Sequence, residues 1–133
     1  MLPRLLLDTH VVIRWVTEAK KLSREQARVL DGSVRRQEFV GLSAISLLET
    51  AVLASQGKLR LKMSLTDFFG ELQENPFLSV LPLTYEIASE AALLGNLRDP
   101  ADRAIVATAR VHRLSLLTSD QRIIESKLVP IVT

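Results

Sequence analysis

The chain has 133 residues, of which 47% are hydrophobic and 24% charged, a composition typical of one compact globular domain. It contains no cysteine, which excludes disulfides and thiolate metal sites, and a net charge of +2 indicates nucleic-acid binding only if the charge is unevenly placed. No apolar run approaches the roughly 20 residues that cross a bilayer, and the segment before Asp8 is too short for a signal peptide. We expect a single cytoplasmic domain over residues 1–133 that does not associate with a membrane.

The first part of the chain alternates short apolar runs with a helical pattern. Residues 5–7 and 39–42 predict two buried strands. Between them, Ser23 and Gln26 form a capping box for a helix that should stop near Gly32.

Two helices are expected next, each bounded by polar caps or helix-breaking residues. The first covers about residues 43–55 and is stopped by Gly57 in a left-handed conformation. The second covers about residues 64–74 and is ended by Asn75 and Pro76.

A third strand is predicted at residues 78–81, and Thr84 caps a helix that extends to about Leu94. Asp99 followed by Pro100 is a strong helix start, with the acid at the N-cap and proline at the first helical position. This helix should run to about residue 113.

The last elements are a strand at residues 114–118, a short helix capped by Ser119 and a fifth strand at residues 129–132. The strands are apolar on both faces, as parallel strands covered by helices must be. Their alternation with helices predicts an α/β fold, a three-layer α/β/α sandwich around a short, mostly parallel sheet of four or five strands.

Four acidic residues fall close to the ends of the predicted strands. Asp8 follows the first strand and Asp120 the fourth, whereas Glu49 and Asp102 lie in early turns of two helices. Ligands of open α/β sheets gather at the carboxyl ends of the strands. We therefore expect these four side chains to meet at one edge of the sheet.

Each acid also has an ordinary structural explanation. Asp8 and Asp120 could be turn or cap residues, Asp102 could complement a helix dipole, and Glu49 could lie on a helix surface. One shared site explains all four positions, whereas the separate readings require four coincidences. Carboxylates brought together must share protons or bind a cation, and an all-oxygen site suits Mg²⁺ or Mn²⁺.

The segments that carry these acids resemble the successive motifs of PIN domains, most closely those of VapC-type toxins. They are residues 6–10, 43–49, 99–109 and 116–120. The likeness covers essentially the whole chain, and the Asp-Pro-Ala-Asp-Arg sequence at residues 99–103 is its most specific part. The resemblance implies a Mg²⁺- or Mn²⁺-dependent endoribonuclease that cleaves RNA, a cognate antitoxin that blocks it, and a homodimer.

By position, Asp8, Glu49 and Asp102 match the core acids of that family, and Asp120 matches its fourth, more variable acid. The resemblance gives all four catalytic and metal-binding roles. Thr9 matches a small polar residue that supports the first acid or the metal.

Several neighbouring residues have structural readings. We expect Asp99 to be a helix cap rather than a ligand, and Arg103 to pair with Asp99, to hold another acid or to contact RNA phosphate. His10 is expected to support or pack against the site, and His112 to lie on the surface. Trp15, at helical spacing from two valines, is expected in the core or at a partner interface.

Alternative functions remain open at this point. A haloacid-dehalogenase-like phosphatase needs a second acid two residues after Asp8, where His10 stands, and a receiver domain needs an acidic pair before its acceptor. A catalytically silent PIN-like module that binds RNA or protein is the main alternative. Basic clusters at residues 20–24, 35–36 and 58–62 could steer RNA or could be ordinary solvated faces.

Overall fold

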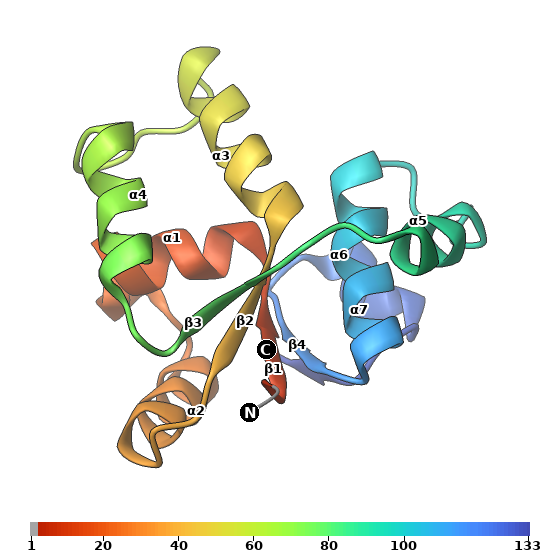
Figure 1. Ribbon diagram of the computed structural model, residues 1–133, viewed down its shortest axis with the longest axis horizontal. Helices are drawn as coiled ribbons and strands as arrows, with labels where there is room; N and C mark the ends of the chain where they lie inside the picture. The colour runs from red at the N-terminus through yellow and green to blue at the C-terminus, as the bar shows by residue number, and fades with distance from the viewer. Residues whose placement is uncertain (1–2) are drawn as a thin grey trace.

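The computed structural model describes residues 3–133 and contains one parallel five-stranded sheet in the order β3-β2-β1-β4-β5 (Figure 1). The first two residues of the predicted domain lie outside the described part. The strands are β1 (Leu5–Leu7), β2 (Val40–Ser43), β3 (Leu78–Leu81), β4 (Ser115–Leu117) and β5 (Ile131–Val132). All five predicted strands and their parallel arrangement are confirmed, with ends that shift by up to two residues.

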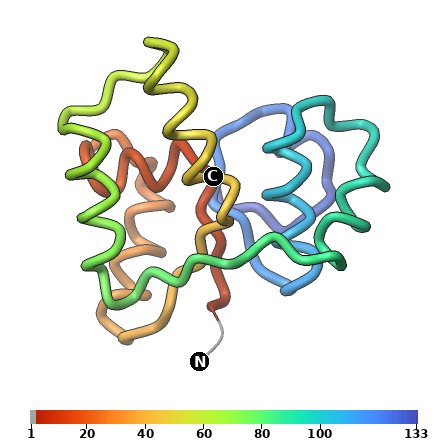
Figure 2. Tube along the Cα trace, turned by 45° about the horizontal axis from the view of Figure 1, so that its top comes forward, coloured from red at the N-terminus to blue at the C-terminus, as the bar shows by residue number. Residues whose placement is uncertain are grey.

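Helices cover both faces of this sheet. They are α1 (Thr9–Thr17), α2 (Arg24–Arg35), α3 (Ala44–Ser55), α4 (Leu65–Glu74), α5 (Tyr85–Ala92), α6 (Pro100–His112) and α7 (Gln121–Ser126), with a 3₁₀ turn at Ala19–Lys21. Figures 1 and 2 show α1, α2 and α4 on one side of the sheet and α5, α6 and α7 on the other. The predicted three-layer α/β/α sandwich is confirmed.

Neighbouring residues of each central strand face opposite helix layers, because side chains alternate along a strand. Leu6 of β1 packs in the core beneath α5 and α6, and Leu7 packs in the core formed with α1 and α4. Both are fully buried. Each such leucine contributes about 1.5–3 kcal/mol by leaving water, so the central strands are held from both sides and their ends are fixed in position.

Two elements differ from the sequence-based expectation. Helix α2 does not stop near Gly32 but continues to Arg35, because its buried face continues through Ser33. Helix α1 follows β1 directly, although its β-branched residues have modest helix propensity. Burial of Val11 and Val12, which lie four and three residues before Trp15, outweighs that propensity, and Trp15 packs against the same core. Within residues 3–133, no helix combines the length and apolarity needed to cross a membrane.

Candidate active site

A pocket of about 210 Å³ lies at the carboxyl ends of the central strands. We call it the acidic pocket, because its polar lining residues are Asp8, Thr9, His10, Glu49, Asp99, Asp102, Asp120 and Arg122. These residues come from four distant stretches of the chain. The four acids expected to meet do line one pocket, together with Thr9 and Asp99.

Asp8 is held by three hydrogen bonds at the junction of β1 and α1. Its backbone N–H donates to the Leu117 carbonyl at 3.0 Å, its Oδ1 accepts from the Thr9 N–H at 2.7 Å, and its Oδ2 accepts from the Thr118 hydroxyl at 2.7 Å. Asp8 is also the N-cap of α1 and is 4% exposed. The side chain is therefore fixed in direction before any ligand arrives.

Thr118 was not singled out from the sequence. Its buried hydroxyl donates to Asp8 and accepts the backbone N–H of Asp120 at 3.0 Å, so it links the two acids. The available signal was a polar residue at the end of an otherwise apolar strand.

Glu49 enters the pocket from α3, which begins at the Ser43 cap. One turn earlier, the buried Ser46 hydroxyl accepts a hydrogen bond from the Thr9 hydroxyl at 2.9 Å and joins α3 to α1. Burial raises the pKa of the Glu49 carboxyl, nearby Asp8 and Asp99 raise it further, and Thr9 opposes them. Glu49 is therefore held near other negative groups, where its own charge is costly.

Asp102 lies in the first turn of α6, as predicted. The Oδ1 atom of Asp99 accepts the backbone N–H of Ala101 at 2.8 Å and that of Asp102 at 3.2 Å, which confirms Asp99 as the helix cap. Burial raises the pKa of Asp102 to about 7, and the charges of Asp99, Asp8 and Asp120 add to the rise. Arg122 opposes it. Ionisation of all these neighbouring carboxylates at once is therefore unfavourable, and a bound cation would reduce their mutual repulsion.

Asp120, rather than Ser119 as predicted, is the N-cap of α7. Its Oδ1 accepts the backbone N–H of Arg122 at 2.9 Å, whereas the Ser119 N–H donates to His10 Nε2 at 2.9 Å. Partial burial acts to raise the pKa of Asp120, but hydrogen bonds from the Arg122 side chain and backbone outweigh it and lower the pKa. Asp120 is therefore ionised more readily than Asp102.

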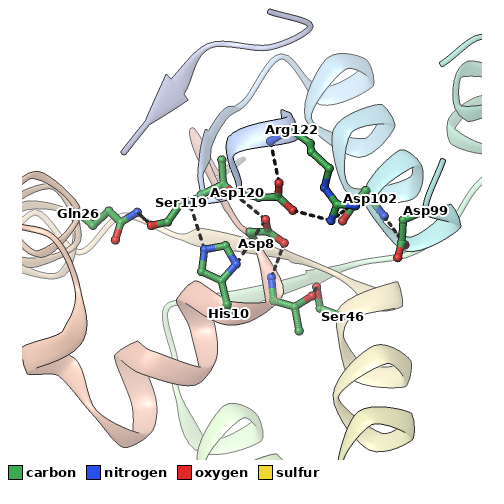
Figure 3. Close-up of polar contacts among 11 residues, drawn as sticks. Asp8, His10, Gln26, Ser46, Asp99, Asp102, Ser119, Asp120 and Arg122 are labelled. Carbon is green, nitrogen blue, oxygen red and sulfur yellow. Dashed lines mark hydrogen bonds and ion pairs between the residues drawn. The ribbon is translucent and has the colours of Figure 1, made fainter. Parts of the chain in front are cut away.

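Arg122 is the second residue that sequence reasoning missed. Its Nη2 lies 3.3 Å from Asp120 Oδ2 and 3.7 Å from Asp102 Oδ2, so one guanidinium faces two of the acids (Figure 3). Nothing in the sequence marks it, because an arginine two residues after a capping acid is common on exposed helices.

His10 lies beside Asp8, with Nδ1 3.6 Å from Asp8 Oδ2. Burial lowers the pKa of His10 and Arg14 lowers it further, whereas Asp8 and Asp120 act in the opposite direction. A neutral imidazole whose Nε2 accepts the Ser119 N–H leaves its hydrogen on Nδ1, toward Asp8. His10 thus fastens the loop after β4 to the start of α1.

Arg103 lies outside the acidic pocket. Its Nε donates to the carbonyl of Leu97, in the segment that leads into α6. This structural contact is none of the three roles expected for Arg103. His112 is exposed, as expected.

The donor set suits a hard divalent ion, since carboxylates with one hydroxyl are the ligands that Mg²⁺ and Mn²⁺ prefer. In the described part of the chain, no three acidic or histidine side chains are arranged so that they could hold a metal ion as they stand. The guanidinium of Arg122 lies against two of the acids. Binding a metal there requires local side-chain movement.

The chain is similar to known proteins over most of its length. Residues 5–127 match the family model described as the PIN domain. Ribonuclease VapC22 of Mycobacterium tuberculosis (strain ATCC 25618 / H37Rv) is 32% identical over 120 residues, which cover 89% of this chain and 88% of that protein.

Solved structures with the same fold include components of toxin–antitoxin assemblies. A toxin–antitoxin complex from Klebsiella pneumoniae matches with a TM-score of 0.67 and 20% identity, covering 97% of this chain and 96% of that one. FitAcB from Neisseria gonorrhoeae matches with a TM-score of 0.65 and 25% identity, covering 97% of this chain and 96% of that one. VapBC2 from Rickettsia felis, bound to a DNA fragment from its promoter, matches with a TM-score of 0.70 and 12% identity, covering 96% of this chain and 96% of that one. At 20% and 12% identity, the first and last of these demonstrate the fold alone.

Proposed function

The chain belongs to the PIN domain family, and we propose on that premise that it is a divalent-metal-dependent endoribonuclease, the toxin of a type II toxin–antitoxin pair. The observation that carries the proposal is the convergence of Asp8, Glu49, Asp102 and Asp120 in the acidic pocket. The similarity to a relative named as a ribonuclease supports the reaction.

Asp8, Glu49 and Asp102 would hold a Mg²⁺ or Mn²⁺ ion, and Asp120 would complete the set or help to hold a second ion. Such an ion would act as a Lewis acid and would lower the pKa of a bound water enough to make it a nucleophile at neutral pH. The chain's own part is to fix the acids: Thr118 orients Asp8, and the contact between Thr9 and Ser46 holds α3 beside α1.

Basic residues near the pocket support an RNA substrate. Leu59 lines the acidic pocket, so the exposed Lys58 and Arg60 flank it on the same segment. Lys21 and Lys62 both pair with Glu18, at 2.9 and 3.5 Å, which draws two of the basic clusters together. Positive charge beside the acids would attract the phosphate backbone toward them.

The partner and location belong to the same proposal. Antitoxin binding and homodimer formation are supported by exposed apolar side chains, including Leu48 on α3, Tyr85 on α5 and Leu93 at the C-cap of α5, which are 60%, 97% and 77% exposed. The cytoplasm is the proposed location, because the proposed substrate is RNA.

The deciding experiment compares Asp8→Asn with wild type in the cleavage of structured RNA in Mg²⁺. Asp67→Asn, on the exposed surface of α4, is the matched control. We expect Asp8→Asn to lose cleavage and Asp67→Asn to keep it, with products that bear 5′-phosphate and 3′-hydroxyl ends. Full activity of Asp8→Asn, or products with a 2′,3′-cyclic phosphate, would reject the proposal.

The alternative, a catalytically silent PIN-like module that binds RNA or protein, predicts a weaker affinity for metal than the proposed nuclease does. If wild type and Asp102→Asn bind Mn²⁺ equally weakly while both still bind RNA, the silent module is the better description.

A further inference from the structure

Arg122 holds a special place in the acidic pocket. Among the described residues it is the single lysine or arginine that lines the pocket, which five carboxylate side chains also line. Its backbone N–H is anchored to Asp120 Oδ1 at 2.9 Å. Its side chain is 73% exposed, so the guanidinium can move while its backbone stays in place.

The contacts of this guanidinium conflict with metal binding. Nη2 lies 3.3 Å from Asp120 Oδ2 and 3.7 Å from Asp102 Oδ2 (Figure 3). A divalent ion bound to either oxygen would lie close to the guanidinium charge and repel it. The two cations therefore compete for the same pair of carboxylates.

The displaced side chain also has space to enter. A second pocket of about 170 Å³ adjoins the acidic pocket and shares Asp102 and Arg122 with it, and its other lining residues are Asn96, Leu97 and Arg98. Arg122 lines both pockets and is exposed. Its movement from one to the other disturbs no buried packing.

We infer that Arg122 is a built-in counter-ion of the acidic pocket and that an entering divalent ion displaces it from Asp102 and Asp120. This inference rests on the proposed function, because it concerns the same metal site. In the metal-free protein, Arg122 offsets the repulsion between the acids. The bound ion takes over that role, so metal affinity is lower than the carboxylates alone would give.

The test is a Mn²⁺ titration of the full-length, metal-free protein, followed by calorimetry or by the electron paramagnetic resonance signal of free Mn²⁺. Arg122→Gln removes the competing charge. Arg98→Gln is the matched control, because it removes an equal charge from the adjoining pocket and lines no part of the acidic pocket. We expect Arg122→Gln to bind Mn²⁺ about three- to tenfold more tightly than Arg98→Gln, the range that two exposed ion pairs can produce. Equal affinities of these two variants would overturn the inference.

Thermal unfolding gives an independent readout. Metal-free Arg122→Gln should melt at a lower temperature than metal-free Arg98→Gln, and saturating Mn²⁺ should raise its melting temperature by more. If Arg122→Gln does not fold without metal, Arg122→Lys replaces it. A lysine keeps the charge but loses the planar guanidinium that faces both carboxylates, so Arg122→Lys should bind Mn²⁺ more tightly than wild type. A Mn²⁺ affinity of Arg122→Lys below that of wild type would count against the inference.

The outcomes distinguish failure of this inference from failure of the proposed function on which it rests. If wild type binds Mn²⁺ and the two glutamine variants bind it equally, the counter-ion role is rejected and the proposed nuclease stands. If neither wild type nor any variant binds Mn²⁺, both are rejected.

Discussion

The hydroxyl of Thr118 donates to Asp8 Oδ2 at 2.7 Å and joins the carboxyl ends of two adjacent parallel strands. Thr118 is fully buried and Asp8 nearly so. Thr118→Val keeps the shape of the side chain but leaves a buried carboxylate oxygen and the Asp120 N–H without this partner. We expect the free energy of unfolding to fall by about 1–3 kcal/mol, measured by urea denaturation. Thr118→Ser should lose much less, and equal losses would show that the hydroxyl contributes nothing.

Metal affinity should depend on pH through Asp102. Burial and neighbouring acids raise the pKa of Asp102 to about 7, and an ion must displace that proton in order to bind. Mn²⁺ affinity should therefore increase with pH by up to about tenfold per unit below pH 7 and level off above it. Titrations in metal-free buffers from pH 5.5 to 8.5 measure this. A pH-independent affinity, or the same profile in Asp102→Asn, would contradict the assignment.

The stability of the metal-free protein should change with pH in the opposite direction. The pKa of Asp102 is higher in the folded protein than in the unfolded chain, so the folded state binds more protons between the two values. The contribution of Asp102 is most favourable below its unfolded pKa and is lost as pH rises to about 7. Asp102→Asn should thus gain stability relative to wild type between about pH 4 and pH 7, as measured by urea denaturation. A constant difference across that range would refute this prediction.

Asp99 combines two effects that substitutions can separate. Its carboxylate caps α6, and its charge raises the pKa of Asp102. Asp99→Ala should destabilise the fold by about 0.5–2 kcal/mol, whereas Asp99→Ser should keep most of the cap. Both should move the pH dependence of Mn²⁺ binding to lower pH by a similar amount. A pH profile that moves in only one of them would show that charge is not the cause.

RNA binding should weaken as salt increases, because phosphate contacts release counterions. Replacing both Lys58 and Arg60 with glutamine should lower RNA affinity and make its dependence on salt shallower. The matched control replaces the exposed Arg28 and Arg113, which line no part of the acidic pocket, with glutamine. Filter binding from 50 to 300 mM salt, in about five steps, compares the two pairs. Equal salt slopes in both double variants would remove the 58–62 cluster from the proposal.

The strands and most helix starts could be predicted because they depend on local patterns. A few adjacent residues are enough to predict the strand at residues 78–81 and the start of α6 at Asp99 and Pro100. The convergence of the four acids followed from the parallel arrangement, because the carboxyl ends of parallel strands share an edge.

The contacts within the site could not be predicted in the same way. The bond between Thr118 and Asp8 depends on the pairing of Leu7 with Leu117, a register that no local pattern reveals. The position of Arg122 depends on the rotamer of an exposed side chain. Helix α1 was missed as an element because its propensity is modest and tertiary burial decides it.

Three of the acids that line the pocket also begin helices: Asp8 caps α1, Asp99 caps α6 and Asp120 caps α7. The same carboxylates thus belong to the proposed site and to three helix starts. A descendant of this protein that drifted toward inactivity by discarding these side chains would weaken three helix starts at once. Selection for a folded chain alone would therefore tend to preserve two of the four proposed ligands, Asp8 and Asp120, together with the neighbouring Asp99.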